Sequence, residues 1–298
     1  MVRLHIWAGS LKMAVLKCLP ALLLGFAASP AVGQDAQSLV NKNLEARGGA
    51  AALDALKGVT FEGRVIFPGD FELTYKEARA RLGAADAARS DLSLQGLDVV
   101  QSYDGHAAWK INPFQGRKDP EKMSADEARQ LADGALIEGP LLASRHDGSK
   151  VQYLGREDFD GTLAYKLKVT QKDGDEFTYW LDPDTYLEIK MDETRRIRGA
   201  QVTSETELGD YEKVGGVYFP MSIENWSQGQ SNQRTRVQIA GAAANPPLGA
   251  DFFAEPRGPG SAAKAGGEPP DASQKAQGKK PPAKSKVSPA NPSKPKGE

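Results

Sequence analysis

The chain has 298 residues, a formal net charge of −1 and 40% hydrophobic residues. This composition supports one sizeable core, and the length alone would allow two domains. The nearly neutral charge gives no general reason to expect nucleic acid as a partner, because nucleic-acid binding depends on an excess of positive charge.

Residues 1–34 are expected to be a cleaved export signal. Basic residues precede the apolar run CLPALLLGFAA, which ends in the small residues SPAVG. Ala31 and Gly33 occupy the positions that signal peptidase requires to be small, so we expect cleavage before Gln34 and a periplasmic location. Met13 also opens a complete signal, so either methionine could be the start. A permanent membrane anchor is disfavoured, because the run is short for a span and is bounded by prolines.

The only cysteine, Cys18, lies in this segment. Lys17 precedes it, where a lipoprotein signal needs a small residue, so lipidation of this cysteine is not expected. After cleavage the chain has no cysteine, which excludes disulfides, thiol catalysis and cysteine metal sites.

The segment after the signal predicts two helices followed by strands. DAQSLVNKNLEARGG places Leu39, Val40 and Leu44 on one flank and ends at a Gly-Gly pair that suits a C-terminal cap. AAALDALKG predicts a second short helix. The apolar period then changes to two in DFELTYK, LAYKLKVT, EFTYWLD and YLEIKMD, which is typical of strands.

Asp-Gly dipeptides bound these runs and predict tight hairpins, because such turns need positive φ. They are Asp104–Gly105, Asp147–Gly148, Asp160–Gly161 and Asp173–Gly174. A further helix is predicted in SADEARQLADGAL, where Ser124 and Glu127 have capping-box spacing. The expected fold class is mostly β (α+β): residues 35–257 form an incomplete antiparallel β-barrel, a curled sheet whose apolar side is covered by two or three helices.

Residues 258–298 are expected to form a disordered Pro/Lys-rich tail, because their only large aliphatic residue is Val287. The tail has eight basic and three acidic residues, and residues 1–34 have three basic and none acidic. The totals of 38 and 39 therefore leave 27 basic and 36 acidic residues in the body, an excess of nine negative charges. Such a tail could adhere to an anionic envelope surface, or it could act as a solubilising segment that folds back on the acidic body.

Paired aspartates in FTYWLDPDTYLEIKM pose the question of catalysis. Asp182 and Asp184 have the spacing of an aspartyl phosphotransferase motif, but its fifth position would be threonine and is Tyr186. That motif also needs a parallel strand–helix setting, whereas both neighbouring runs alternate as antiparallel strands. Asp-Pro-Asp-Thr is favourable turn chemistry, so we predict a hairpin corner.

The remaining chemical candidates are weak. Asp158 and Asp160 would begin a calcium loop, but its twelfth position, which requires glutamate, is Val169. His106 and His146 flank turns, and neither has a second histidine at helical spacing, so no zinc site or other cofactor is expected. No nucleophile elbow or phosphate loop is present, and no catalytic residue is predicted. A carboxylate-based hydrolase remains the one enzyme hypothesis.

Aromatic side chains are concentrated in the predicted strands. Each of them could be ordinary sheet core. If the curled sheet encloses a cavity, some of them would instead line it for an apolar ligand. The candidate ligand-binding residues are Tyr75, Trp109, Tyr165, Phe177, Tyr179, Trp180 and Trp226.

Four blocks of sequence, taken in order, resemble the LolA-like group of exported bacterial proteins, often labelled outer-membrane lipoprotein-sorting proteins. They are GGAAALDALKGVTFEG (48–63), QSYDGHAAWKINP (101–113), LGREDFDGTLAYKLKVTQKDGDEFTYWLDPDTYLEIK (154–190) and GDYEKVGGVYFPMSIE (209–224). The resemblance implies an incomplete antiparallel β-barrel with an apolar interior covered by helices. It also implies carriage of acyl chains without chemistry, or, as in some relatives, envelope-stress sensing through a bound lipid or peptide and a membrane partner.

We therefore expect a periplasmic, non-enzymatic protein that holds a lipid or lipoprotein acyl chain in a half-barrel cavity. The helix at 124–136, with flanking loops 114–124 and 133–146, is the expected lid. The alternative is an envelope sensor or interaction module that binds a protein partner, such as an envelope membrane protein, through its cavity or a sheet edge. The hydrolase is the third hypothesis.

Overall fold

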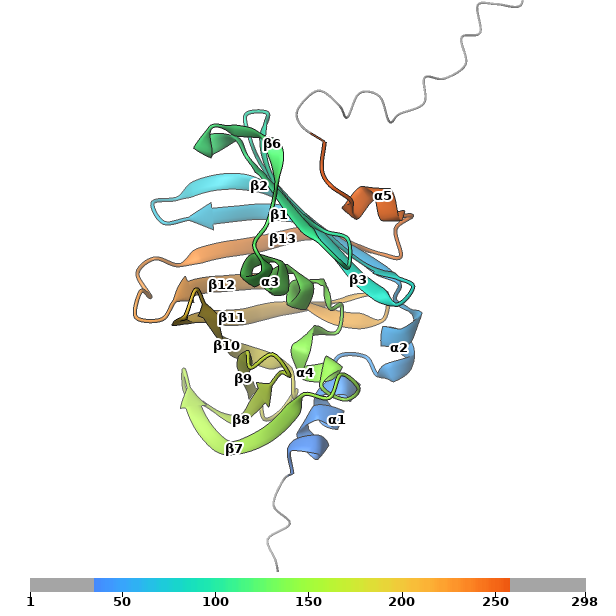
Figure 1. The fold of residues 1–298 in the computed structure, drawn as a ribbon. Coiled ribbons are helices and arrows are strands. Elements are labelled where there is room, and N and C mark those ends of the chain that lie inside the picture. The colour runs from blue at the N-terminus through green and yellow to red at the C-terminus, as the bar shows by residue number, and fades with distance from the viewer. Residues whose placement is uncertain (1–34, 258–298) are drawn as a thin grey trace, which may run out of the picture.

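The computed structural model describes residues 35–257. The expected export signal, the choice of start and the tail at 258–298 lie outside the described residues. The described chain forms one antiparallel sheet of 13 strands that curls around a covered inner face without closing (Figure 1). This confirms the expected mostly-β, incomplete barrel.

The first half of the chain forms one side of the curl. It contains α1 (Ala36–Ala46), α2 (Ala50–Ala55), β1 (Gly58–Phe67), β2 (Phe71–Leu82), β3 (Ala85–Leu94), β4 (Leu97–Tyr103), β5 (Ala108–Asn112), the 3-10 turn η1 (Pro113–Gln115) and β6 (Arg117–Lys122). A crossover follows with α3 (Ala125–Ala135) and α4 (Gly139–Ala143). The second half contains β7 (Lys150–Phe159), β8 (Thr162–Thr170), β9 (Glu176–Leu181), β10 (Glu188–Ile197), β11 (Ala200–Val214), β12 (Val217–Ser227), β13 (Thr235–Ala244) and α5 (Ala250–Phe253).

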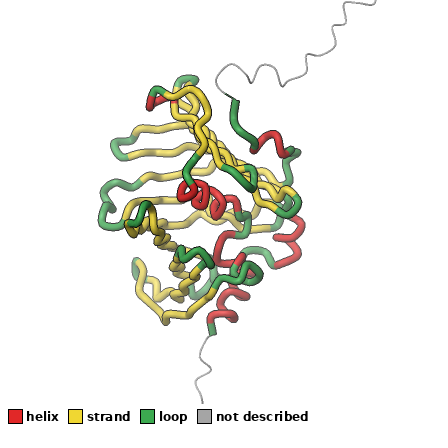
Figure 2. Tube along the Cα trace, viewed as in Figure 1, coloured by secondary structure: helices red, strands yellow, loops and turns green. Residues whose placement is uncertain are grey.

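The strand order shows two meanders, which are joined in the middle of the sheet by the first strand and the last. Strands β1 to β6 run in sequence on one side, β13 to β7 run on the other, and β1 pairs with β13 where they meet. The two free edges, β6 and β7, are therefore neighbours in the chain, and the crossover with α3 and α4 connects them. In this way the topology lays the helices of the crossover across the inner face of the sheet (Figure 2).

Local turn chemistry explains most of the corners. Asp160 and Gly161, at φ of 49° and 80°, form the two-residue hairpin between β7 and β8. Asp182 accepts hydrogen bonds from the backbone N–H of Asp184 (3.1 Å) and of Thr185 (2.7 Å), which confirms the predicted corner. One prediction was wrong. The pair at 147–148 connects α4 to β7 and is not a hairpin, since the same left-handed glycine also serves a helix-to-strand connection.

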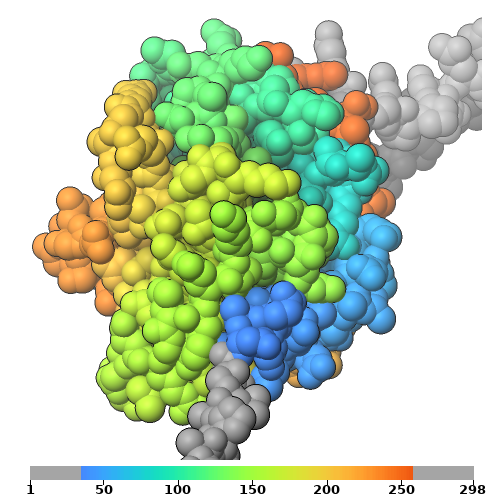
Figure 3. Space-filling model, turned by 60° about the horizontal axis from the view of Figure 1, so that its bottom comes forward, coloured from blue at the N-terminus to red at the C-terminus, as the bar shows by residue number. Residues whose placement is uncertain are grey.

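The main core lies on the inner face. Alternate residues of β8, β9 and β12 pack there against α1, α2 and the crossover, through buried side chains such as Leu39, Leu142, Leu167 and Phe177. Figure 3 shows α1, in blue, against the green segment that includes α4 and β7. A second, smaller cluster lies on the outer face, where Phe253 of α5 covers the alanines of β2 and β3.

Strands β12 and β13 separate part-way along their length. They pair only from Asn225, opposite Thr235, to Ser222, opposite Gln238. Beyond that point the backbone of Tyr218 bonds to Arg47 instead: its N–H donates to the Arg47 carbonyl (2.9 Å), and its carbonyl accepts from Arg47 Nε (2.7 Å). Pro220 has no N–H to offer on this side of the strand. The junction of α1 and α2 thus replaces β13 here and brings Arg47 to the inner face.

Candidate ligand-binding cavity

A cavity of about 230 Å³ lies between the inner face of the sheet and the crossover. Its apolar wall comes from β1, β9 to β13 and the crossover: Phe61, Ile137, Pro140, Leu141, Tyr179, Met191, Leu208, Phe219, Pro220, Ile223 and Ile239. Its polar lining consists of Arg47, Glu77, Arg79, Glu138, Glu188, Thr206 and Tyr211. The cavity thus combines an apolar wall with a few polar groups at defined positions, the composition typical of small-molecule sites.

Two aromatic rings organise the sheet side of the cavity. Phe61 of β1 and Phe219 of β12 meet edge to face, with ring centroids 5.3 Å apart and planes at 67°. This is a favoured geometry for aromatic pairs. Each ring also carries a guanidinium group: that of Arg79 lies 5.8 Å from the Phe61 centroid, and that of Arg47 lies 5.4 Å from the Phe219 centroid. The arginines are therefore held against the wall by stacking as well as by charge.

Both arginines are paired with a carboxylate. Arg47 Nη1 lies 3.2 Å from Glu188 Oε1, and both side chains are less than a tenth exposed. Tyr211 donates from its hydroxyl to the Glu188 carbonyl at 2.8 Å and to Glu188 Oε2 at 3.2 Å. These extra hydrogen bonds matter, because a buried ion pair recovers its desolvation cost only when its remaining polar atoms are also satisfied.

The second pair is built from one strand. Glu77 and Arg79 of β2 face the cavity two residues apart, with Arg79 Nε 2.6 Å from Glu77 Oε1. Tyr75, two residues earlier on the same face, donates its hydroxyl to the other oxygen of Glu77. Burial raises the pKa of Tyr75 well above its ordinary value, so it remains a donor at physiological pH.

Tyr179 is the exception in this lining. Its side chain is 3% exposed and faces the cavity from β9, yet its hydroxyl makes no hydrogen bond within residues 35–257. The backbone of Leu141 approaches this oxygen without forming a bond of normal hydrogen-bond geometry. Burial, and then the charge of Glu188, raise the pKa of Tyr179 well above its ordinary value, so the hydroxyl keeps its proton.

Solved structures share this architecture. A domain described as an outer-membrane lipoprotein-sorting protein, from Vibrio parahaemolyticus, superposes with a TM-score of 0.52 at 13% identity, covering 74% of this chain and 97% of its own. A DUF1329 family protein from Desulfovibrio piger gives 0.51 at 13% identity (73% and 96% covered), and a LolA superfamily protein from Nitrosomonas europaea gives 0.50 at 16% (74% and 98%). The fold is LolA-like. The sequence matches no family model and none of the curated proteins.

The LolA-like fold divides the seven predicted aromatic residues between its two faces. Tyr75, Tyr165, Phe177 and Tyr179 lie on the inner face, and of the seven Tyr179 lines the cavity. Phe177 packs beneath Arg195, and Tyr165 stacks on Tyr186 with centroids 5.7 Å apart, both outside the cavity lining.

The three tryptophans among the predicted residues lie on the outer face, because successive residues of a strand point to opposite sides. Trp180 follows Tyr179 and lies between two ammonium groups, 4.6 Å from Lys166 and 4.7 Å from Lys190. Trp226 lies under the guanidinium of Arg234, at 3.9 Å. Trp109 is next to Lys110, whose ammonium reaches α3 on the inner face, so Trp109 faces outward.

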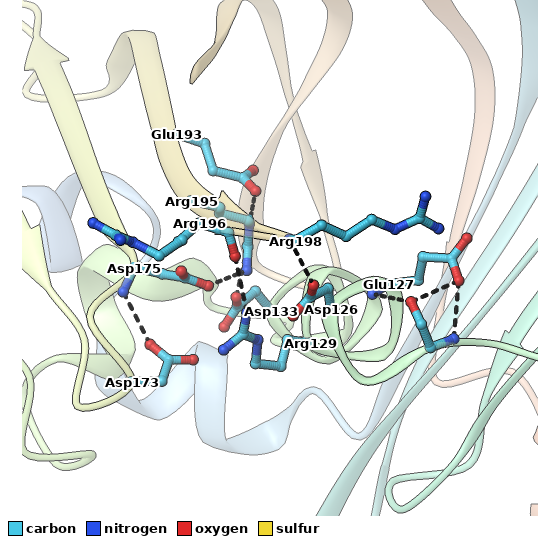
Figure 4. A network of polar contacts seen from close by, with 11 residues as sticks. Asp126, Glu127, Arg129, Asp133, Asp173, Asp175, Glu193, Arg195, Arg196 and Arg198 are labelled. Carbon is cyan, nitrogen blue, oxygen red and sulfur yellow. Dashed lines mark hydrogen bonds and ion pairs between the residues drawn. The ribbon is translucent and has the colours of Figure 1, made fainter. Parts of the chain in front are cut away.

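A charged network fastens the expected lid helix to the LolA-like sheet (Figure 4). Arg195 of β10, 5% exposed, donates to Asp133 of α3 at 2.7 Å, to Asp175 at 2.6 Å and to Glu193. Burial raises the pKa of Asp175, against the opposing charge of Arg195. At the other end of the helix, Asp126 accepts from the backbone N–H of the β10–β11 hairpin at 3.2 Å. Asp133 also accepts from Gln171 Nε2, in the turn between β8 and β9, at 2.8 Å, so α3 is tied to two separate hairpins.

Three further features bear on the expectations from sequence. The capping box of α3 is present, with Ser124 and Glu127 bonded reciprocally. Between residues 35 and 257, no group of three or more His, Cys, Asp or Glu side chains is arranged to hold a metal ion. None of the described helices is long and apolar enough to cross a membrane.

Proposed function

We propose that this protein is a non-enzymatic binding protein of the bacterial envelope that holds an acyl chain of a lipid or lipoprotein. The observation that carries the proposal is the cavity between the inner face and the crossover, with eleven apolar or aromatic side chains in its wall. Burial of an acyl chain there would contribute about 0.8 kcal/mol for each methylene. The neighbouring folds support this, since one is described as a lipoprotein-sorting protein.

The size of the cavity sets a condition on the proposal. Its 230 Å³ exceeds the ~150 Å³ of a cavity known to take benzene, so part of a chain fits without rearrangement. A full acyl chain would require the crossover to move outward. α4 is the natural moving part, because its own Leu141 and the preceding Ile137 form the helical side of the wall.

A protein-binding role through a sheet edge has weaker support. Edge strand β6 reads RKDPEK and carries both a proline and five charged residues. Edge strand β7 has a bulge at Leu154 and carries three charged residues, 156–158, just before its last residue. Prolines, charges and bulges are the features that protect an edge from pairing with another strand. The cavity is therefore the better-supported site.

The proposed location is the periplasm, with residues 1–34 as the signal. For the tail, we propose attraction to anionic envelope surfaces, from its excess of five positive charges. Co-sedimentation with anionic vesicles at low and high salt, with and without residues 258–298, would test this. Equal sedimentation of the two forms at low salt would refute it.

The first experiment is native mass spectrometry of the protein purified without detergent from a Gram-negative host. We expect a bound mass that dissociates as lipid, and its loss in Ile223→Trp, which fills the cavity. Leu163→Trp, at a side chain that is 52% exposed, is the matched control and should retain the lipid. A clean protein mass that stays unchanged after phospholipid and lipopeptide are added would overturn the proposal.

A further inference from the structure

The hydroxyl of Tyr179 is a donor for which the described chain supplies no acceptor. It lies on the wall of the cavity, is almost completely buried, and keeps its proton. Two other tyrosines near the cavity donate their hydroxyl hydrogen bonds within the protein: Tyr75 to Glu77, and Tyr211 to Glu188. A buried unpaired hydroxyl costs stability, so a phenylalanine would be the more stable residue unless the hydroxyl serves a ligand.

The charges around the cavity restrict what that ligand can be. Its lining has two cations, Arg47 and Arg79, and three carboxylates, Glu77, Glu138 and Glu188. Both cations are already engaged, Arg47 by Glu188 and Arg79 by Glu77. The third carboxylate, Glu138, is paired with an arginine and a histidine outside the lining. An anionic ligand would therefore find no uncommitted cation in this lining, and its burial would be costly.

We infer that Tyr179 donates a hydrogen bond to the neutral carbonyl oxygen of an acyl ester or amide, while the hydrocarbon chain lies along the apolar wall. The inference rests on the proposed function and narrows it to acylated molecules, as opposed to free fatty acids. A carbonyl oxygen satisfies the buried hydroxyl and brings no charge into the site. The adjoining wall of Met191, Ile223 and Ile239 offers the chain an apolar surface.

The test uses the full-length protein and four probes with the same ten-carbon chain: methyl decanoate, N-methyldecanamide, decanoate at pH 8, and n-decane. Affinities are measured by displacement of a fluorescent apolar probe. The variants are Tyr179→Phe and, as a control, Tyr218→Phe, whose side chain faces away from the cavity next to Phe219. The ester and amide arms separate a lipid source from an N-acylated protein source.

We expect wild type to bind the ester or the amide more tightly than decanoate and decane. In Tyr179→Phe the favoured carbonyl probe should bind about threefold to tenfold more weakly, the size of one neutral hydrogen bond, while decane is unaffected. The same variant should have a Tm about 2–4 °C higher, because an unsatisfied group has been removed. Tyr218→Phe should change neither quantity.

The inference is overturned if Tyr179→Phe binds the ester and the amide as tightly as wild type does, or if decanoate is the tightest ligand. In either case the proposed function survives, because acyl binding has been observed. Failure of all four probes to bind would instead remove the proposed function, and the inference with it. A Tm lowered by Tyr179→Phe would show that the hydroxyl has a partner in the protein, which also refutes the inference.

Discussion

Replacing Arg195 by methionine should be among the most damaging single changes in this protein. Arg195 is 5% exposed and bonds to three carboxylates, of which that of Asp175 is 3% exposed. Methionine keeps the aliphatic part of the side chain but leaves buried negative charge without a cation. Removing one partner of a buried ion pair costs about 3–5 kcal/mol. For a folded body of this size, that corresponds to a fall in Tm of roughly 6–20 °C.

The loss should depend on pH in a defined direction. Burial already raises the pKa of Asp175 in the folded state, so its ionisation opposes folding. Without Arg195 the pKa of Asp175 rises further. At pH values above this pKa the buried carboxylate is ionised, and its full cost to folding stability is present. As the pH falls through that value the carboxyl becomes neutral in the folded state, and the difference between wild type and variant should shrink.

The assay is urea denaturation of wild type and Arg195→Met at pH 7.5 and pH 4.5, with hydrogen exchange of α3 as a local readout. Asp175→Asn in the Arg195→Met background is the matched control, and it should recover about 1 kcal/mol or more at the higher pH. A loss below about 1 kcal/mol, or one of equal size at both pH values, would refute the argument that this arginine compensates buried charge.

Four further predictions concern the sheet, α5 and α3. Gly63→Ala should lower the free energy of unfolding by at least about 2 kcal/mol in urea denaturation, because its Cβ would lie 2.0 Å from a carbonyl oxygen of β13. By contrast, a Cβ added by Gly134→Ala in α3 would meet nothing within 4 Å, so this change should raise the free energy of unfolding by about 1 kcal/mol. A lower free energy of unfolding in this variant would contradict the open geometry. Phe253→Ala should lower the free energy of unfolding by about 3–5 kcal/mol, because this side chain is fully buried. Phe252→Ala is the control and should lower it far less, because Phe252 is 39% exposed. Lys110, and then the Ser124 cap, lower the pKa of Glu127 to about 2. The ionised Glu127 side chain therefore contributes to folding stability above pH 4.5, and this contribution is lost as the pH falls towards 2. Since the Glu127 side chain is 38% exposed, Glu127→Gln should lower the free energy of unfolding by only about 1 kcal/mol at pH 7. If the stability difference between this variant and wild type persisted at pH 2, the charge of Glu127 would be excluded as its cause.

What could be predicted from the sequence was what depends on neighbours in the chain. The corner at Asp182 and the cap at Ser124 involve residues within three positions, so their chemistry can be recognised in the sequence. The curled sheet followed from the period-two pattern and the resemblance. The Asp147 pair was misassigned because a dipeptide specifies a backbone conformation and leaves open which elements it connects.

The candidate site was harder to predict, because it depends on which face of each strand is turned inward. In KEARARL, charged residues alternate with alanines, a pattern that would normally put Glu77 and Arg79 in solvent. The structure has the reverse arrangement: these charges face the cavity, and the alanines are covered by Phe253 from the far end of the chain. The tryptophans at 180 and 226 were misleading for the same reason, since long cationic side chains bury them on the outer face.

The pairing of the first strand with the last has a consequence for how this chain folds. Val59 lies opposite Ala244, so the contact that makes the sheet continuous closes a loop of nearly the whole folded body. Such non-local pairing slows folding, because the entropy of closing the loop is lost before the contacts are gained. Until β13 arrives, β1 is an unpaired edge exposed to other chains. We therefore expect slow refolding from urea and a yield that falls with protein concentration, which would make a chaperone that protects the half-finished sheet useful to this protein.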